Sequence, residues 1–176
     1  MIALGCGQIE IDPKPDTSSF SSTAVDLTLA EEAAEWTSTP GLPVRPGDPG
    51  YNYHLVASRL QRRVDLSSFS LRPNAFLLAW TRETVGLPLP SRIAARVEGK
   101  SSLARLGLGI HVTAPTIHAG FRGQIQLEMF NAGPQTIILD AGMKICQLIF
   151  EQTSGTPEKG YSGVFAGQKA PLPTPN

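Results

Sequence analysis

The chain has 176 residues, of which 41% are hydrophobic and 17% charged, and its formal net charge is zero. This length suffices for one domain with a substantial buried core. The balanced charge excludes a general electrostatic attraction to nucleic acid or to an anionic membrane surface, and no apolar run approaches the length of a membrane span. We therefore expect no nucleic acid and no membrane as partners, and any phosphate site has to be local.

The two cysteines, Cys6 and Cys146, are too few for a disulfide scaffold. Residues 1–7 are apolar but lack the basic residues of a secretory signal. We expect a reduced, cytoplasmic protein with a single domain over residues 1–176. Residues 152–176 are rich in Gly, Ser and Pro and are expected to form a flexible C-terminal tail that closes over a ligand.

Short segments rich in Val, Ile, Leu, Phe and Thr lie between 15 prolines and 17 glycines, which favours an all-β barrel or sandwich with little helix. In the first part of the chain, residues 8–11 and 22–29 alternate between apolar and polar and predict strands. Residues 31–36 predict a brief helix, and the proline-rich residues 40–49 predict an extended loop.

Further strands are predicted from residue 76 onward. Residues 76–80 form an apolar run that we expect to end before the polar residues at 81–84, and residues 93–97 predict the next strand. After these, residues 136–139 and 143–150 read as two strands, each preceded by a glycine-containing turn.

The clearest strand pattern covers residues 124–130. It places Ile125, Leu127 and Met129 on one face and Glu128 on the other, beside two glutamines and a phenylalanine. A rigid strand is a good platform for a general acid or base, so Glu128 is a candidate catalytic residue. The alternative is a glutamate that merely faces solvent on an amphipathic strand.

A cluster of polar side chains occupies residues 98–107, Glu-Gly-Lys-Ser-Ser-Leu-Ala-Arg-Leu-Gly. Ser101 or Ser102 is suited to cap a short helix, and Gly107 is suited to end it. Lys100 adds a full charge to the exposed N–H groups of the helix start, an arrangement suited to phosphate. The alternative is a capped helix in a surface loop that binds nothing.

Other common catalytic signatures are absent from the sequence. The histidines His54, His111 and His118 lack the spacing of a metal site, and two isolated cysteines cannot supply an H-x-E…P-C-x-x-C zinc signature. There is no Walker A loop and no Gly-x-Ser-x-Gly elbow. Phe121 follows a glycine turn and is either a core anchor or a flat wall against a sugar or base.

Four segments together resemble the dCTP deaminases, relatives of the trimeric dUTPases. They are residues 98–107, with the string Lys-Ser-Ser-Leu-Ala-Arg-Leu-Gly, and residues 111–123, 126–131 and 141–151. The resemblance implies a dUTPase-like distorted β-barrel that assembles as a homotrimer with active sites at subunit interfaces. It also implies hydrolytic deamination of dCTP to dUTP and ammonia without zinc, Mg²⁺ bound with the substrate triphosphate, and dTTP as a candidate inhibitor.

The resemblance assigns catalytic roles to four residues. Glu128 would activate a water that attacks C4 of cytosine and would then protonate the departing ammonia. The Ser101 hydroxyl and the Ala114 carbonyl would hold that water, and Arg105 would stabilise the charge of Glu128 across the interface. The positions implied to bind the nucleotide are Lys100, Ser102, Thr113, His118, Phe121, Gln126, Leu127, Gln147, Tyr161 and Gln168.

Three departures from the family pattern leave other functions open. His118 stands where the family has an aspartate that, in dUTPases, activates the hydrolytic water. Val164 lies near the place of a phosphate-binding lysine in a shortened tail, and the usual opening helix is missing. The loss of this aspartate argues against two alternatives, a dUTP diphosphatase and a bifunctional enzyme that converts dCTP to dUMP. His118 and the altered tail instead motivate a third alternative, a nucleotide-binding paralogue without turnover.

Overall fold

The computed structural model describes residues 2–41, 43–163 and 165–169. The strands are β1 (Glu10–Asp12), β2 (Ala24–Trp36), β3 (Gln61–Asp65), β4 (Phe69–Leu71), β5 (Phe76–Gly86), β6 (Ile93–Gly99), β7 (Leu108–Gly109), β8 (Thr116–Ile117), β9 (Arg122–Asn131), β10 (Ile137–Leu139) and β11 (Lys144–Gln152). The helices are α1 (Ile2–Gly5), α2 (Tyr53–Leu60) and α3 (Ser101–Ala104), with 3-10 turns η1 (Thr17–Ser19) and η2 (Leu89–Ser91). The prediction of a β protein with minor helix is confirmed.

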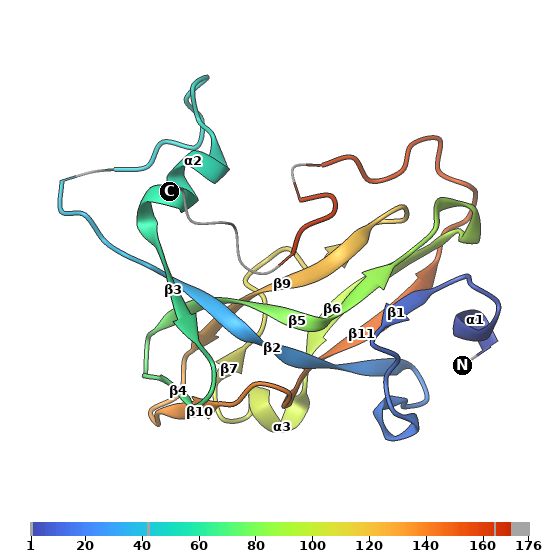
Figure 1. Ribbon diagram of the computed structural model, residues 1–176, viewed down its shortest axis with the longest axis horizontal. Helices are drawn as coiled ribbons and strands as arrows, with labels where there is room; N and C mark the ends of the chain where they lie inside the picture. Colours follow the sequence, from blue (N-terminus) through green and yellow to red (C-terminus); the bar gives the residue numbers. More distant parts are fainter. Residues whose placement is uncertain (1, 42, 164, 170–176) are drawn as a thin grey trace.

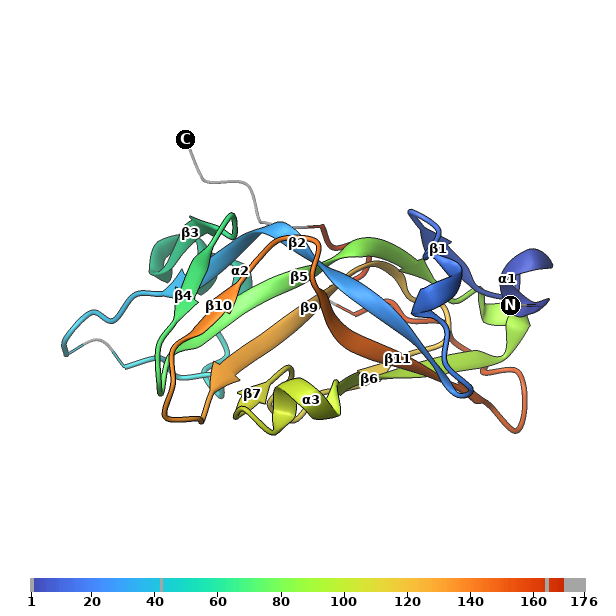
Figure 2. The same ribbon diagram turned by 90° about the horizontal axis from the view of Figure 1, so that it is seen from below.

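Nine strands form one sheet in the order β7-β9-β5-β2-β11-β6-β8, with β1 paired to β5 and β3 paired to β2. Strands β4 and β10 form a separate two-stranded sheet. The large sheet curls strongly, so that β9 and β6 come to face each other across the interior (Figures 1 and 2). This curled, barrel-like sheet agrees with the expected fold.

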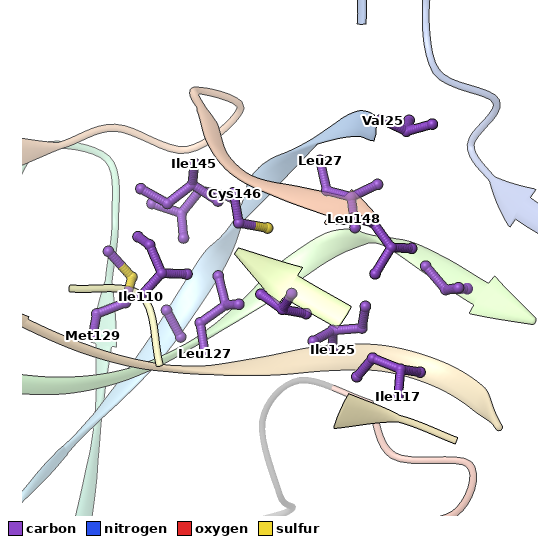
Figure 3. Close-up of a cluster of buried hydrophobic side chains, with 14 of the residues drawn as sticks. Val25, Leu27, Ile110, Ile117, Ile125, Leu127, Met129, Ile145, Cys146 and Leu148 are labelled. Atoms are coloured by element: carbon purple, nitrogen blue, oxygen red, sulfur yellow. The ribbon is translucent and has the colours of Figure 1, made fainter. Parts of the chain in front are cut away.

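The core fills the interior of this curl. Ile125, Leu127 and Met129 of β9 are buried, as their alternation predicts, and they face Cys146 and Leu148 of β11 (Figure 3). All five belong to the main cluster of buried side chains. Because the inward residues of β9 belong to this cluster, its alternate residues are turned to the outer face of the sheet.

Helix α3 forms where the short helix was predicted, but neither serine caps it. Lys100 occupies the N-cap position in an extended conformation, and its side chain makes no capping hydrogen bond. The expectation that Ser101 or Ser102 is the cap is therefore wrong, because these two serines are already the first two residues of the helix. Gly107 ends the turn as expected, with φ at +96° and its N–H donating to the Ala104 carbonyl at 2.9 Å.

The predicted helix at residues 31–36 is wrong, because β2 continues as a strand to Trp36. This part of β2 pairs with β3 from Glu32↔Asp65 to Trp36↔Gln61, and with β5 through Ala33↔Ala79. Ala33 and Ala34 favour helix intrinsically, but both are buried in these pairings. Tertiary contacts override the local preference.

Strand β5 does not end before Thr81, as predicted, but runs on to Gly86. Its polar residues Thr81 and Glu83 are buried with their hydrogen bonds satisfied. The Glu83 carboxylate accepts hydrogen bonds from the backbone N–H of Thr28 at 2.9 Å and from its hydroxyl at 2.7 Å. The Thr81 hydroxyl donates to the Glu83 carbonyl and accepts from the Ile125 N–H. Because these hydrogen bonds satisfy the buried polar groups, β5 can continue as a strand through residues 81–84.

The sequence interpretation missed α1, α2 and the short strands β3, β4, β7 and β8. Helix α2 has a recognisable start, since the Asn52 side chain accepts a hydrogen bond from the Leu55 N–H at 3.2 Å. The N-terminus carries one helical turn, α1, where no opening helix was expected. Among the described residues, no helix has the length and hydropathy to cross a membrane.

We expect the two thiols to differ sharply in reactivity. Burial raises the pKa of the Cys146 thiol, and the nearby carboxylates of Glu83 and Asp26 raise it further, whereas Cys6 is exposed. Since the thiolate is the nucleophile, titration with a chromogenic disulfide should modify only Cys6 in the native protein and both residues in denaturant. The Cys6→Ser variant should show no native reactivity. Fast modification of Cys146 in that variant would contradict the packing of β11.

Candidate functional site

A cleft of about 440 Å³ opens beside β9. Strands β2, β5, β8 and β9, helix α2, the loops before and after β8 and the C-terminal segment all contribute to its walls. Its lining residues are Trp36, Tyr53, Phe76, Leu78, Ala114, Thr116, Ile117, His118, Phe121, Ile125, Gln126, Glu128, Tyr161, Phe165 and Gln168.

Glu128 lies on the floor of this cleft. It is half-buried, and β5 places Leu78 directly beside it in the antiparallel register. Its Oε2 atom accepts a hydrogen bond from the Val112 N–H at 3.3 Å, and Ala114 lines the cleft two residues further on. A carboxylate held between an apolar strand and a turn of exposed backbone can exchange a proton with a bound water.

Aromatic rings form one wall of the cleft. Phe121 is buried against the core, and His118 lies three residues before it in the same loop. The rings of His118 and Tyr161 are stacked, with centroids 5.6 Å apart and planes 14° apart. Phe121 also contacts the Tyr161 ring, at 5.9 Å and 55°. The loop thus presents two rings to one tyrosine of the C-terminal segment.

Backbone hydrogen bonds hold the C-terminal segment against the cleft. The Tyr161 N–H donates to the Ala119 carbonyl at 3.1 Å. Further along, Gln168 bonds to the backbone of Gln124 in both directions, accepting at 3.1 Å and donating from its side chain at 2.9 Å. Tyr161 and Gln168, both predicted nucleotide contacts, therefore lie at the cleft. Val164 and residues 170–176, the last part of the expected tail, lie outside the described residues.

The far end of the cleft is aromatic as well, and sequence reasoning missed it. Phe165 contacts Tyr53 of α2 edge-on, with centroids 5.2 Å apart, and Tyr53 contacts Trp36 at 6.3 Å. These residues come from three distant parts of the chain. The signals in the sequence were the Asn52 cap of α2 and the aromatic residues that follow the proline-rich loop.

The polar motif at α3 lies apart from the cleft. Lys100, Ser101, Ser102 and Arg105 are not among the residues that line it. Ser101, Ser102 and Arg105 are exposed, and α3 sits beside β7, away from α2 (Figures 1 and 2). One copy of the chain therefore brings the predicted cleft residues together but leaves the α3 residues outside the cleft.

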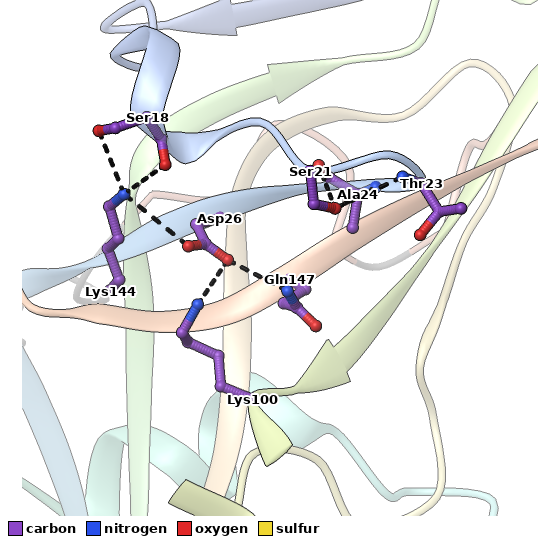
Figure 4. Close-up of polar contacts among 8 residues, drawn as sticks. All are labelled: Ser18, Ser21, Thr23, Ala24, Asp26, Lys100, Lys144 and Gln147. Atoms are coloured by element: carbon purple, nitrogen blue, oxygen red, sulfur yellow. Dashed lines mark hydrogen bonds and ion pairs between the residues drawn. The ribbon is translucent and has the colours of Figure 1, made fainter. Parts of the chain in front are cut away.

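Lys100 takes part in a separate cluster of charges (Figure 4). Its Nζ lies 2.6 Å from Oδ1 of Asp26, which also accepts a hydrogen bond from the Gln147 side-chain amide at 3.3 Å. Lys144 approaches the other oxygen of Asp26 at 3.8 Å and donates to the Ser18 carbonyl at 3.0 Å. Two of the predicted phosphate or nucleotide contacts, Lys100 and Gln147, thus share one carboxylate.

The two remaining predicted contacts differ in exposure. Thr113 is exposed in the loop after β7, next to the cleft residue Ala114. Leu127 is completely buried in the core, so that only its backbone can reach a ligand. Within the described part of the chain, no group of three or more His, Cys, Asp or Glu side chains could hold a metal ion.

The chain is similar to proteins of one family. A family model described as dCTP deaminase-like matches residues 2–153. The "dCTP deaminase, dUMP-forming" of Aquifex aeolicus (strain VF5) is 37% identical over 169 residues, which cover 96% of this chain and 86% of the relative. The dCTP deaminase of Rhodospirillum rubrum is 35% identical over 175 residues, which cover 96% of this chain and 89% of the relative.

A solved structure shares the fold. The crystal structure of 2'-deoxycytidine 5'-triphosphate deaminase from Agrobacterium tumefaciens matches with a TM-score of 0.65 and 22% identity. The match covers 85% of this chain but only 45% of the chain in that crystal structure. At this level of identity, the likeness shows that the architecture is common to both.

Asp26 should stabilise the fold through the charges around it. We expect Asp26→Asn to lower the free energy of unfolding by about 1–3 kcal/mol, because Lys100 and Lys144 lose a charged acceptor. Urea unfolding of this variant, of Lys100→Met and of the double variant would give the coupling energy directly. Asp140→Asn, at an exposed turn, serves as the control and should change stability by less than about 0.5 kcal/mol. Zero coupling would contradict the Lys100–Asp26 pair.

Proposed function

Because the chain belongs to the dCTP deaminase-like family, we propose that it is a cytoplasmic enzyme that converts dCTP, bound as its Mg²⁺ complex, to dUTP and ammonia. The observation that carries this proposal is the position of Glu128, half-buried on the cleft floor with Ala114, His118 and Phe121 around it. The relatives named dCTP deaminase support the choice of substrate.

In the proposed reaction, Glu128 removes a proton from a water molecule held by the Ala114 carbonyl and the Ser101 hydroxyl. The water oxygen forms a bond to C4 of cytosine, which gives a tetrahedral intermediate. Glu128 then delivers the proton to the exocyclic amino group, and the C4–N bond breaks to release ammonia. One water is consumed, no redox change occurs, and the carboxylate is regenerated.

A second copy of the chain completes this site in the proposal. Ser101 and Arg105 lie outside the cleft of their own chain and are exposed, so they are available to the cleft of a neighbour. Leu106 and Val112, with 57% and 54% of their surfaces exposed, give the same region an apolar surface that a subunit interface would cover. We propose a closed homotrimer with three equivalent sites.

The other proposed contacts are divided among the sugar, the base and the triphosphate of the nucleotide. Phe121 packs under the deoxyribose and excludes a 2'-hydroxyl, with His118 at the sugar edge. Gln126, Thr113 and the Leu127 backbone bind around the base, whereas Lys100, Ser102 and Gln147 bind the triphosphate. Tyr161 and Gln168 close the C-terminal segment over the nucleotide. A pyrimidine triphosphate such as dTTP fits the same contacts and is proposed as an inhibitor.

A second candidate is conversion of dCTP to dUMP, because the Aquifex aeolicus relative carries the name dUMP-forming. Hydrolysis of the triphosphate would need a base for a second water. His118 occupies the position where an aspartate would supply that base. Its presence disfavours hydrolysis of the triphosphate relative to deamination alone. The products separate the two: dUTP with ammonia indicates deamination alone, and dUMP with pyrophosphate indicates the bifunctional reaction.

Glu128→Gln should abolish turnover. We expect kcat for dCTP to fall by about 10²- to 10⁴-fold, because the amide cannot shuttle a proton, while nucleotide binding measured by calorimetry is largely kept. Ammonia release with Mg²⁺ and dCTP is the assay. Glu151→Gln, at the exposed end of β11, is the matched control and should retain full activity. Near-normal turnover by Glu128→Gln would remove this residue from the mechanism.

Mixing two inactive variants should restore activity if the site is shared between subunits. A trimer that contains only Ser101→Ala chains, or only Glu128→Gln chains, has no intact site. After the two chains are unfolded together and refolded in equal amounts, about a quarter of the sites would combine an intact Ser101 with an intact Glu128 from the neighbour. Ammonia release near this level is expected. Activity that stays at the level of the separate variants would contradict a shared site.

A further inference from the structure

His118 has a structural partner that its place at the sugar edge does not require. Its exposed ring lies parallel to the ring of Tyr161, with centroids 5.6 Å apart and planes 14° apart. Tyr161 is partly buried and packs against the core, and Phe121 contacts it at 5.9 Å. The tyrosine ring is therefore in contact with two rings that come from one short loop.

The backbone around this contact is shaped for close approach. Gly120 has φ at +87°, and a Cβ atom there would lie 2.8 Å from the Tyr161 nitrogen and 2.9 Å from the Gly160 Cα. Only glycine avoids both the strain and the collision. The hydrogen bond from the Tyr161 N–H to the Ala119 carbonyl, at 3.1 Å, lies in the same place. Loop residues 118–121 thus form a docking site for residues 159–163, called here the docked segment.

We propose that His118 is a positioning residue that holds the docked segment against the cleft through its ring contact with Tyr161. The inference rests on the proposed function in so far as Tyr161 contacts the nucleotide. A carboxylate at position 118 has no ring face to offer, so an aspartate there could bond to a sugar hydroxyl but could not hold Tyr161. The ring of His118 can hold Tyr161, whereas the aspartate of the family pattern cannot.

Hydrogen exchange without nucleotide tests the docking alone. Peptides that contain the Tyr161 amide should exchange about three- to ten-fold faster in His118→Ala and His118→Asp than in the wild type, because a stacked pair of rings is lost. His118→Phe keeps a ring and should restore protection. Ser162→Ala, at an exposed neighbour, is the control, and unchanged exchange in β9 verifies the fold of each variant. Equal exchange at Tyr161 in all variants would overturn the proposal.

Steady-state kinetics with dCTP tests whether the docking positions Tyr161 for substrate. We expect His118→Asp to raise KM about three- to ten-fold with a smaller effect on kcat, and His118→Phe to lie closer to the wild type. The reverse order, in which Asp is normal and Phe is impaired, would mean that His118 acts only on the sugar and would overturn the proposal. If the wild type does not turn over dCTP, the proposed function fails, while the exchange data still decide the docking.

Discussion

The alternation of β9 is the constraint on which both the core and the candidate site depend. Ile125, Leu127 and Met129 are buried in the curl of the sheet, so the residues between them have to face the cleft. A shift of one residue in the pairing with β5 would exchange the two faces and would bury Glu128 in an apolar core. The energy of core packing therefore fixes the face of the sheet on which Glu128 lies, and the hydrogen bond from the Val112 N–H adds to this.

The cleft of a single chain contains a candidate base but little positive charge for a triphosphate. The cations of the phosphate motif are kept apart from it by the way α3 and β7 are attached to the fold. Gly107 lies so close to Gly133 that a Cβ atom would collide with the Gly133 backbone, and the buried Asn131 binds the Gly133 N–H at 2.9 Å. The position of α3 is thus set by a tight turn. Relocation of α3 toward its own cleft would break this turn, which favours a second chain as the source of the missing groups.

Local patterns were sufficient to predict some elements and insufficient for others. The faces of β9 and the glycine end of α3 follow from alternation and from the needs of a left-handed residue, both of which are local properties. Residues 31–36 were misjudged because the decisive partners, β3 and β5, are distant in the sequence. The end of β5 was placed too early because the hydrogen bonds from Thr28 to Glu83 cannot be read from residues 81–84.

In the candidate site, too, some residues could be predicted from the sequence and others depend on contacts between distant parts of the chain. Glu128 and the α3 motif could be selected from the sequence, and the family resemblance added Tyr161 and Gln168. The aromatic end of the cleft could not be predicted, because Trp36, Tyr53 and Phe165 meet only through the paths of β2, α2 and the C-terminal segment. The contact of His118 with Tyr161 likewise joins residues that are 43 positions apart in the sequence.

The charges around Asp26 bear on how a triphosphate could be bound. Lys100 is neutralised by Asp26 at 2.6 Å, so a phosphate that takes this lysine has to compete with a carboxylate. An Asp26 left without partners in a partly buried position would be costly. Lys144 also approaches Asp26, at 3.8 Å, and it remains when Lys100 turns away. The cluster can therefore release one cation while its carboxylate stays partnered, which lowers the cost of the exchange.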